Sequence, residues 1–152
     1  MCGFVAPAAR VVSLVPSETE SVAALAGVER LVGRTDYCEE PRGAIERVPC
    51  VGGTKKIEVG AVIALAPDPV LANQEENGRR DVERLIAAGL SVHVSFPRTI
   101  DDAVAYLRAL VTMLGLGGRP PRASTRSRRA PPRCAPARRA CASSCRSGGT
   151  RG

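Results

Sequence analysis

Four short apolar runs alternate with segments of helical period between residues 10 and 114, and this alternation leaves few architectures open. The runs are rich in β-branched residues, as strands buried on both faces are. Parallel neighbours need a crossover connection, which a helix usually supplies. We therefore predict an α/β fold, a Rossmann-like single lobe with a short parallel sheet flanked by helices. The predicted strands are residues 10–15, 31–34, 69–72 and 91–95.

The segments between these strands carry signals for where helices begin and end. Ser17 is followed three positions later by Glu20, the spacing of a capping box, so a helix is expected to begin there and to end at Gly27. Thr99 and the acidic pair after it resemble another helix start. The positions expected to face the sheet are Val22, Leu25 and Ala26, then Val59, Val62, Ile63 and Ala66, then Val82, Leu85 and Ile86, and last Ile100, Ala103, Val104, Leu107, Val111 and Leu114.

The composition of the chain changes at residue 117. Residues 1–116 carry 12 Lys and Arg against 15 Asp and Glu, whereas residues 117–152 carry ten Arg and no acid. The second segment also has no Val, Ile, Leu, Met or aromatic residue, so it cannot build a core. We expect a flexible N-terminus over 1–9, a folded lobe over 10–116 and a disordered basic tail over 117–152. One hypothesis for the tail is a frameshift product of GC-rich DNA, and the other is non-specific nucleic-acid binding.

Several function classes lack their usual motifs. No run approaches the roughly 18 apolar residues of a spanning helix, and no signal peptide is visible, so the chain as written reads as cytoplasmic. The six cysteines include no CxxC pair and His93 is the only histidine, so a metal site is not expected. P-loop, GxGxxG and GxSxG motifs are missing too. We predict no catalytic residue and no cofactor, with His93 structural and Cys38 open as a reactive thiol if exposed.

Loops that leave the carboxyl ends of parallel strands gather at one edge of the sheet, where ligands of such folds bind. The predicted loops carry two of the chain's four aromatic residues, Tyr37 and Phe96, together with Arg98. Aromatic faces beside a cation suit a large, flat, partly anionic ligand. The alternative is that the two rings only pack their own loops.

Five segments follow one another with even spacing through the predicted lobe. They are VVSLVPSETE (11–20), VGRTDYC (32–38), VPCVGGTK (48–55), LAPDPVLAN (65–73) and FPRT (96–99). In this order they resemble the N-terminal lobe of the helical-backbone metal-chelate receptors. Those proteins are the substrate-binding components of ABC importers for cobalamin, ferric siderophores and haem. Pro69 departs from the family pattern, which puts the pairing of the third strand in doubt.

The resemblance implies two lobes joined by a long rigid helix, with the metal chelate (cobalamin, haem or a ferric siderophore) held between them. It further implies an ABC permease as partner, a periplasmic or cell-surface location and no enzymatic activity. Docking on the permease is implied for Glu58, whose alternative role is to interact with a helix dipole. Ligand contacts are implied for Tyr37, Gly53, Thr54, Asn73, Glu75, Phe96 and Arg98.

Beyond residue 114 the sequence shows no second lobe, so a truncated lobe with weak or undetectable affinity is expected. The alternatives from other function classes are a free-standing flavodoxin-like domain, with a nucleotide-binding or enzymatic role, and non-specific nucleic-acid binding through the tail.

Overall fold

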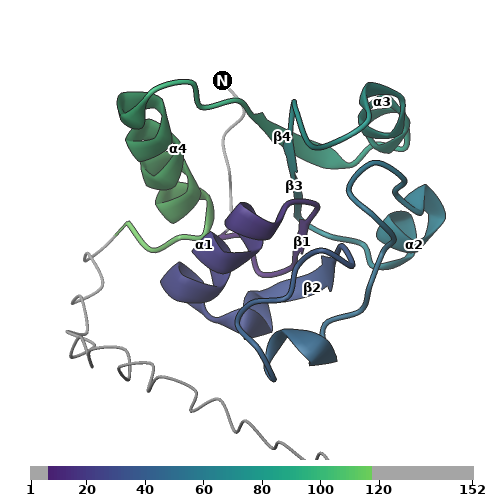
Figure 1. The fold of residues 1–152 in the computed structure, drawn as a ribbon, viewed down its shortest axis with the longest axis horizontal. Coiled ribbons are helices and arrows are strands. Elements are labelled where there is room, and N and C mark those ends of the chain that lie inside the picture. Colours follow the sequence, from purple (N-terminus) through teal and green to yellow (C-terminus); the bar gives the residue numbers. More distant parts are fainter. Residues whose placement is uncertain (1–6, 118–152) are drawn as a thin grey trace, which may run out of the picture. The chain divides into compact units, whose positions relative to one another are not determined.

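A computed structural model of the chain describes residues 7–117 as strands alternating with helices (Figure 1). The strands are β1 (Val11–Ser13), β2 (Leu31–Arg34), β3 (Pro69–Asn73) and β4 (Ser91–Ser95). The α-helices are α1 (Pro16–Ala26), α2 (Val59–Ala64), α3 (Arg79–Ala87) and α4 (Ile100–Met113), with short 3-10 turns at Val28–Arg30 and Ile45–Arg47. Within residues 7–117, none of the helices combines the length and the apolar character that a membrane span requires.

Two of the predicted segments lie almost entirely outside the described residues. The basic tail over 117–152 is described only at residue 117, and the flexible N-terminus over 1–9 only at residues 7–9. Disorder, a shifted reading frame and nucleic-acid binding therefore stay predictions for the tail.

All four strands are parallel and lie in the order β2-β1-β3-β4, which confirms the predicted α/β architecture. β1 lies between its two neighbours, pairing Val11 with Leu31 of β2 and Val12 with Val70 of β3. β3 and β4 pair over their full lengths. Pro69 stands at the first position of β3, where a strand accommodates proline, and it pairs with Ser91.

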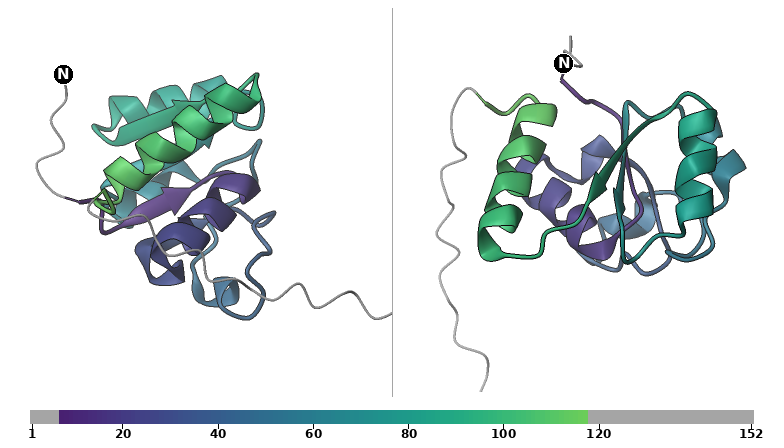
Figure 2. Two further views of the ribbon diagram at one scale, coloured as in Figure 1. Left: turned by 90° about the vertical axis from the view of Figure 1, so that its left-hand side faces the viewer. Right: turned by 90° about the horizontal axis from the view of Figure 1, so that it is seen from above.

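Helices cover both faces of the sheet (Figure 2): α1 and α4 pack on one face, and α2 and α3 on the other. Successive strand residues point to opposite faces, so each strand contributes to both cores. Val11 and Leu71 pack with α1 and α4, whereas Val12, Val70 and Ala72 pack with α2 and α3. The apolar strands are thus buried on both sides, as their composition predicts.

The two predicted helix starts have different outcomes. At α4, the Thr99 side chain accepts a hydrogen bond from the Asp102 amide, and the Asp102 side chain accepts one from the Thr99 amide, so this is a true capping box. The expected capping box at Ser17 and Glu20 is wrong, because α1 begins at Pro16 and its N-cap is Val15, two residues before Ser17. Proline favours the first helical position because its φ is already helical and it has no N–H to satisfy.

Several side chains expected to face the sheet are instead exposed, although Val22, Val62 and Leu85 are buried as predicted. α4 docks through a neighbouring stripe that is anchored near its C-terminal end. A helical period fixes the spacing of a stripe but does not decide which of two overlapping stripes packs. The exposed residues are Ile63, Ala66, Ile86, Ile100, Val104 and Leu107. The residues of α4 that pack on the core are Tyr106, Leu110 and Met113, and Leu114, just after the helix, is buried as predicted.

Candidate functional site

The carboxyl ends of the strands and the loops beside them form one edge of the lobe, which we call the strand-end edge. It comprises the start of α1 and residues 35–38, 52–56, 73–77 and 96–99. These segments contain every residue for which the resemblance implies a ligand contact. The structure divides those residues into three groups. The Tyr37 group is Tyr37 and Gly53, the central Asn73 group is Thr54, Asn73 and Glu75, and the Phe96 group is Phe96 and Arg98.

Asn77 joins three of these segments, although nothing in the sequence distinguishes it from an exposed loop asparagine. Its side chain is 6% exposed, and its Nδ2 donates hydrogen bonds of 3.1 Å to both the Leu14 and Thr54 carbonyl oxygens. Its Oδ1 accepts a 2.8 Å hydrogen bond from the Asn73 amide. Because one side-chain amide satisfies three backbone groups, it fixes the relative positions of three segments.

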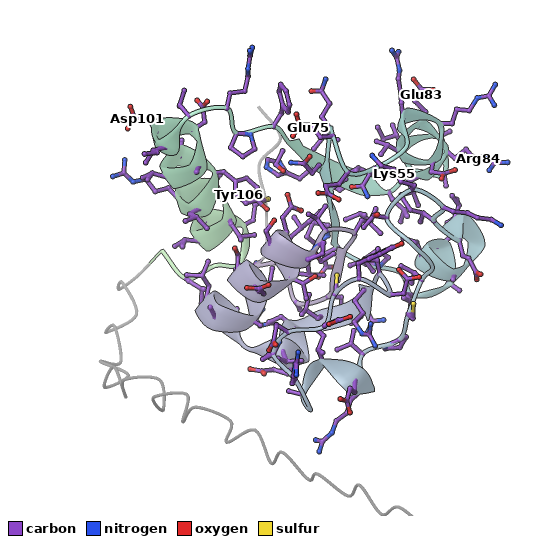
Figure 3. All side chains as sticks on the ribbon, viewed as in Figure 1. Lys55, Glu75, Glu83, Arg84, Asp101 and Tyr106 are labelled. Carbon is purple, nitrogen blue, oxygen red and sulfur yellow. The ribbon has the colours of Figure 1, made fainter. Side chains whose placement is uncertain are left out.

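In the central Asn73 group, some side-chain polar atoms are already occupied by hydrogen bonds within the loops. The Asn73 Oδ1 accepts a 2.8 Å hydrogen bond from the Glu75 amide, and its Nδ2 donates to the Ser95 Oγ at 3.2 Å. Thr54 is buried. Glu75 is exposed, and the Lys55 Nζ donates to its carbonyl oxygen, which joins two loops (Figure 3). In this group Glu75 is therefore better placed than Asn73 or Thr54 to meet a ligand.

Tyr37 and Gly53 lie side by side at one end of the edge. A Cβ on Gly53 would lie 3.7 Å from the Tyr37 ring and 3.6 Å from the Asp36 carboxylate. At Gly52, φ is +96° and a Cβ would lie 2.7 Å from the Lys56 carbonyl oxygen, so the loop requires glycine there. Tyr37 is 62% exposed and lines a hollow of about 370 Å³. The ring is thus presented to solvent rather than used to pack the loop.

Phe96 and Arg98 form the group at the β4 end of the edge. The guanidinium carbon of Arg98 lies 5.8 Å from the centre of the Phe96 ring, within cation–π range. Phe96 is 41% exposed and Arg98 is exposed too, so the pair offers an aromatic and a cationic surface together. Among the described residues, no ring contact links Phe96 to Tyr37.

Glu58 stands at the N-cap of α2, on the rim of the hollow beside Tyr37. Its side chain is exposed and, within the described part of the chain, makes no capping hydrogen bond. The geometry therefore leaves the carboxylate available to a partner protein. Its role in permease docking stays a prediction.

Glu18 is a buried acid at this edge that the sequence did not single out. It is 3% exposed, and its Oε1 accepts a hydrogen bond from the Ser95 hydroxyl. Neither its Oε2 nor the nearby Tyr106 hydroxyl has a hydrogen-bond partner among residues 7–117. Burial raises the pKa of Glu18 to about 7, against the opposing effect of the Ser95 and Tyr106 hydroxyls. Burial, followed by the nearby Glu18 charge, also raises the pKa of Tyr106.

The side chains of Cys38 and His93 both pack against neighbouring side chains. Cys38 is 1% exposed, and its Sγ lies 3.0 Å from the donating Thr19 hydroxyl and 3.2 Å from the Thr35 hydroxyl. A reactive Cys38 would require an exposed thiol, and this thiol is buried. His93 stacks on Tyr106 with 5.7 Å between ring centres, and burial lowers its pKa. Residues 7–117 hold no cluster of three or more His, Cys, Asp or Glu side chains suited to a metal ion.

Comparisons with known proteins found relatives that bind vitamin B12 or haem. A curated vitamin B12-binding protein of Yersinia pestis (strain Pestoides F) is 34% identical over 103 residues, which are 68% of this chain and 36% of the relative. The crystal structure of the periplasmic vitamin B12-binding protein of Vibrio cholerae matches with a TM-score of 0.64 and 28% identity, covering 70% of this chain and 42% of that one. No family model matches the chain.

A second solved structure, a periplasmic haem-binding protein from Pseudomonas aeruginosa, matches with a TM-score of 0.66 and 28% identity. The match covers 72% of this chain and 39% of that one. The chain spans little more than a third of the length of the curated relatives it matches. The chain therefore corresponds to the N-terminal lobe of a metal-chelate binding protein, the kind of protein to which these vitamin B12-binding and haem-binding relatives belong.

Proposed function

We propose that this chain is one lobe of the substrate-binding component of an ABC-type importer for a metal chelate such as cobalamin, haem or a ferric siderophore. The observation that carries the proposal is the strand-end edge itself. There Tyr37 and the Phe96–Arg98 pair are exposed, on a lobe whose relatives are named for binding vitamin B12 and haem. The relatives are binding proteins, and no enzymatic step is proposed.

The proposed binding works by contact with the faces and the rim of the chelate. Its flat faces lie against the Tyr37 and Phe96 rings, while Arg98 and the exposed Glu75 meet polar groups at its rim. Tight small-molecule sites bury most of the ligand surface, and a single edge buries only one side. We therefore expect a dissociation constant above about 1 µM for this chain.

Titration of the full chain with cyanocobalamin, haemin and a ferric siderophore tests this proposal. Saturable binding of one of them is expected, and Tyr37→Ala or Phe96→Ala should weaken it about tenfold because each removes one of the two ring contacts. Ile63→Ala is the matched control, since this exposed apolar side chain lies on α2 outside the edge. Submicromolar binding contradicts the one-sided site. If none of the three chelates binds, the proposed function is contradicted.

The proposed partner is an ABC permease, and Glu58 is the proposed contact. An exposed acid that meets basic residues of a partner governs the rate and the register of docking more than its affinity. The proposed compartment is the periplasm, because the solved relatives are described as periplasmic. Fractionation of cells that express the full chain tests the location, and recovery in the cytoplasm alone contradicts it.

A further inference from the structure

An apolar stripe runs along the outer side of α4, a helix that lies at the margin of the lobe (Figure 2). We call it the outer stripe, and its residues are Ile100, Val104, Leu107 and Val111. Ile100 is 83% exposed, Val104 and Leu107 are exposed too, and Val111 is half-buried. Because α4 packs on the core through other positions, residues 7–117 leave the outer stripe largely uncovered.

The spacing of the outer stripe is that of a coiled-coil seam. Its residues are separated by four, three and four positions, so they lie in one row along about three turns of the helix. Sites for small molecules are concave, whereas this row projects from a helix surface. The outer stripe therefore suits a second helix that carries apolar residues at the same spacing.

The rest of the chain lacks the residues to cover the outer stripe. Residues 118–152 contain no Val, Ile, Leu, Met or aromatic residue, so they have no apolar row to place on it. Residues 1–6 contain three large apolar residues, which are fewer than the positions to be covered. In contrast, α4 of a second copy carries a matching row, because it has the same sequence.

The charges beside the outer stripe complement those of a second copy in one orientation. Asp101 and Arg108 lie about two turns apart on the same flank, both are exposed, and neither forms an ion pair within the described lobe (Figure 3). In an antiparallel helix pair, a two-fold axis passes between Val104 and Leu107. It brings Asp101 of each copy opposite Arg108 of the other, which gives two ion pairs. In a parallel pair, the charged flank would meet the opposite flank, which carries no charge.

We propose that α4 is a homodimer interface, on which the α4 helix of a second copy packs in antiparallel orientation. A single helix pair is at the small end of specific interfaces, so we expect a dissociation constant of about 100 µM. α4 follows directly on residues 96–99 of the strand-end edge. The two edges therefore lie at opposite ends of a helix pair about 21 Å long, and both stay open to ligand.

Sedimentation equilibrium of the full chain without chelate tests the interface. Over about 5–500 µM, the average mass should rise from that of one copy toward that of two. Leu107→Lys places a charge in the seam and should weaken self-association at least about tenfold. Ile86→Lys is the matched control, because Ile86 is exposed on α3, outside the outer stripe. A monomer at every concentration overturns the proposal, and so does unchanged self-association of Leu107→Lys.

A charge exchange tests the orientation and serves if Leu107→Lys fails to fold. Asp101→Arg and Arg108→Asp should each self-associate at least about threefold more weakly, because like charges then face each other. A mixture of the two variants restores both ion pairs in the mixed dimer, which should form more tightly than either variant alone. The ten arginines of residues 117–152 are common to all variants, so their repulsion does not affect the comparison. A mixed dimer no tighter than the single variants overturns the antiparallel interface.

Addition of cyanocobalamin separates this inference from the proposed function. The antiparallel pair keeps the strand-end edges apart, so saturating ligand should leave the dimerisation constant within about threefold. A larger change overturns the antiparallel pair, because it would link the edge to the interface. If the chain dimerises without binding any chelate, the interface is supported and the proposed function is contradicted. If the chain binds a chelate as a monomer, the reverse holds.

Discussion

At the scale of single residues, the Glu18 carboxyl couples proton binding to the stability of the lobe. Its pKa is raised from the ordinary 4.5 to about 7, chiefly by burial. Between these two values the folded chain binds more protons than the unfolded chain. The free energy of unfolding therefore falls as pH rises through this window and levels off above it. The whole shift corresponds to about 3 kcal/mol.

Glu18→Gln should remove this pH dependence. The amide cannot ionise, so the variant should be more stable than the parent by about 1–3 kcal/mol near pH 8 and should differ much less near pH 5. Urea unfolding followed by circular dichroism at both pH values measures the difference. Glu20→Gln, an exposed change on the same helix, should leave the parent pH profile intact. A Glu18→Gln variant with the slope of the parent would show that Glu18 is solvated.

Two cysteines of the described lobe should differ sharply in reactivity. Cys38 is buried under the Thr19 and Thr35 hydroxyls, whereas Cys50 is exposed. Iodoacetamide requires an accessible thiolate, so it should label Cys50 at least about tenfold faster in the native chain. Peptide mapping by mass spectrometry reads each site separately, and labelling in denaturant, where the two rates should converge, is the control. Comparable native rates would mean that the Cys38 loop opens readily.

At the scale of elements, α4 carries two apolar stripes with different burial. Leu107 is 41% exposed, whereas Leu110, less than one turn later, is 1% exposed in the core beneath α1. Leu110→Ala should lower the free energy of unfolding by about 2–4 kcal/mol, because it leaves a cavity as well as losing burial. Leu107→Ala makes the same chemical change and should cost less than about 1 kcal/mol. Chemical denaturation measures the free energy of unfolding of both variants. Equal losses of stability would contradict the burial of Leu110 and the exposure of Leu107.

The amide of Asn77 should be a major determinant of how the loops are held. Asn77→Ala leaves the Leu14 and Thr54 carbonyls and the Asn73 amide without their partner, at a cost of about 2–4 kcal/mol. Gln74→Ala, at an exposed position in the same loop, should cost less than about 0.5 kcal/mol. Denaturation gives the energies, and hydrogen exchange should show faster exchange at Asn73 in Asn77→Ala alone. Unchanged exchange there would contradict the joining role.

Strand positions could be predicted from the sequence better than helix faces. The strands at 31–34 and 91–95 match β2 and β4 residue for residue, because short β-branched runs between turn residues have few alternative structures. The grouping of the loops at the strand-end edge also follows from parallel topology. Glu18 and Asn77 could not be predicted, since their burial depends on Ser95 and Leu14, which are 77 and 63 positions away in sequence.

At the scale of the whole molecule, the strand-end edge is one side of the proposed chelate site, and the described residues supply no second side. The curated relatives are nearly three times as long as the matched segment, which spans 36% of one of them. Enclosure between two surfaces strengthens every polar contact by excluding water. A single lobe has the contacts of one surface and no such exclusion.

This difference predicts that a metal chelate bound to the chain stays open to small solutes. Cobalamins, haemin and ferric siderophores all contain a reducible metal, so the rate of reduction by dithionite reports access to it. Because one face of the ligand remains in solvent, the bound rate should lie within about threefold of the free rate, whereas an enclosed ligand should be at least about tenfold slower. Stopped-flow absorbance on the chelate that binds in titration measures both rates under the same conditions. Strong protection would show that the chain encloses its ligand, as a second copy facing the first would, and the one-sided site would then be wrong.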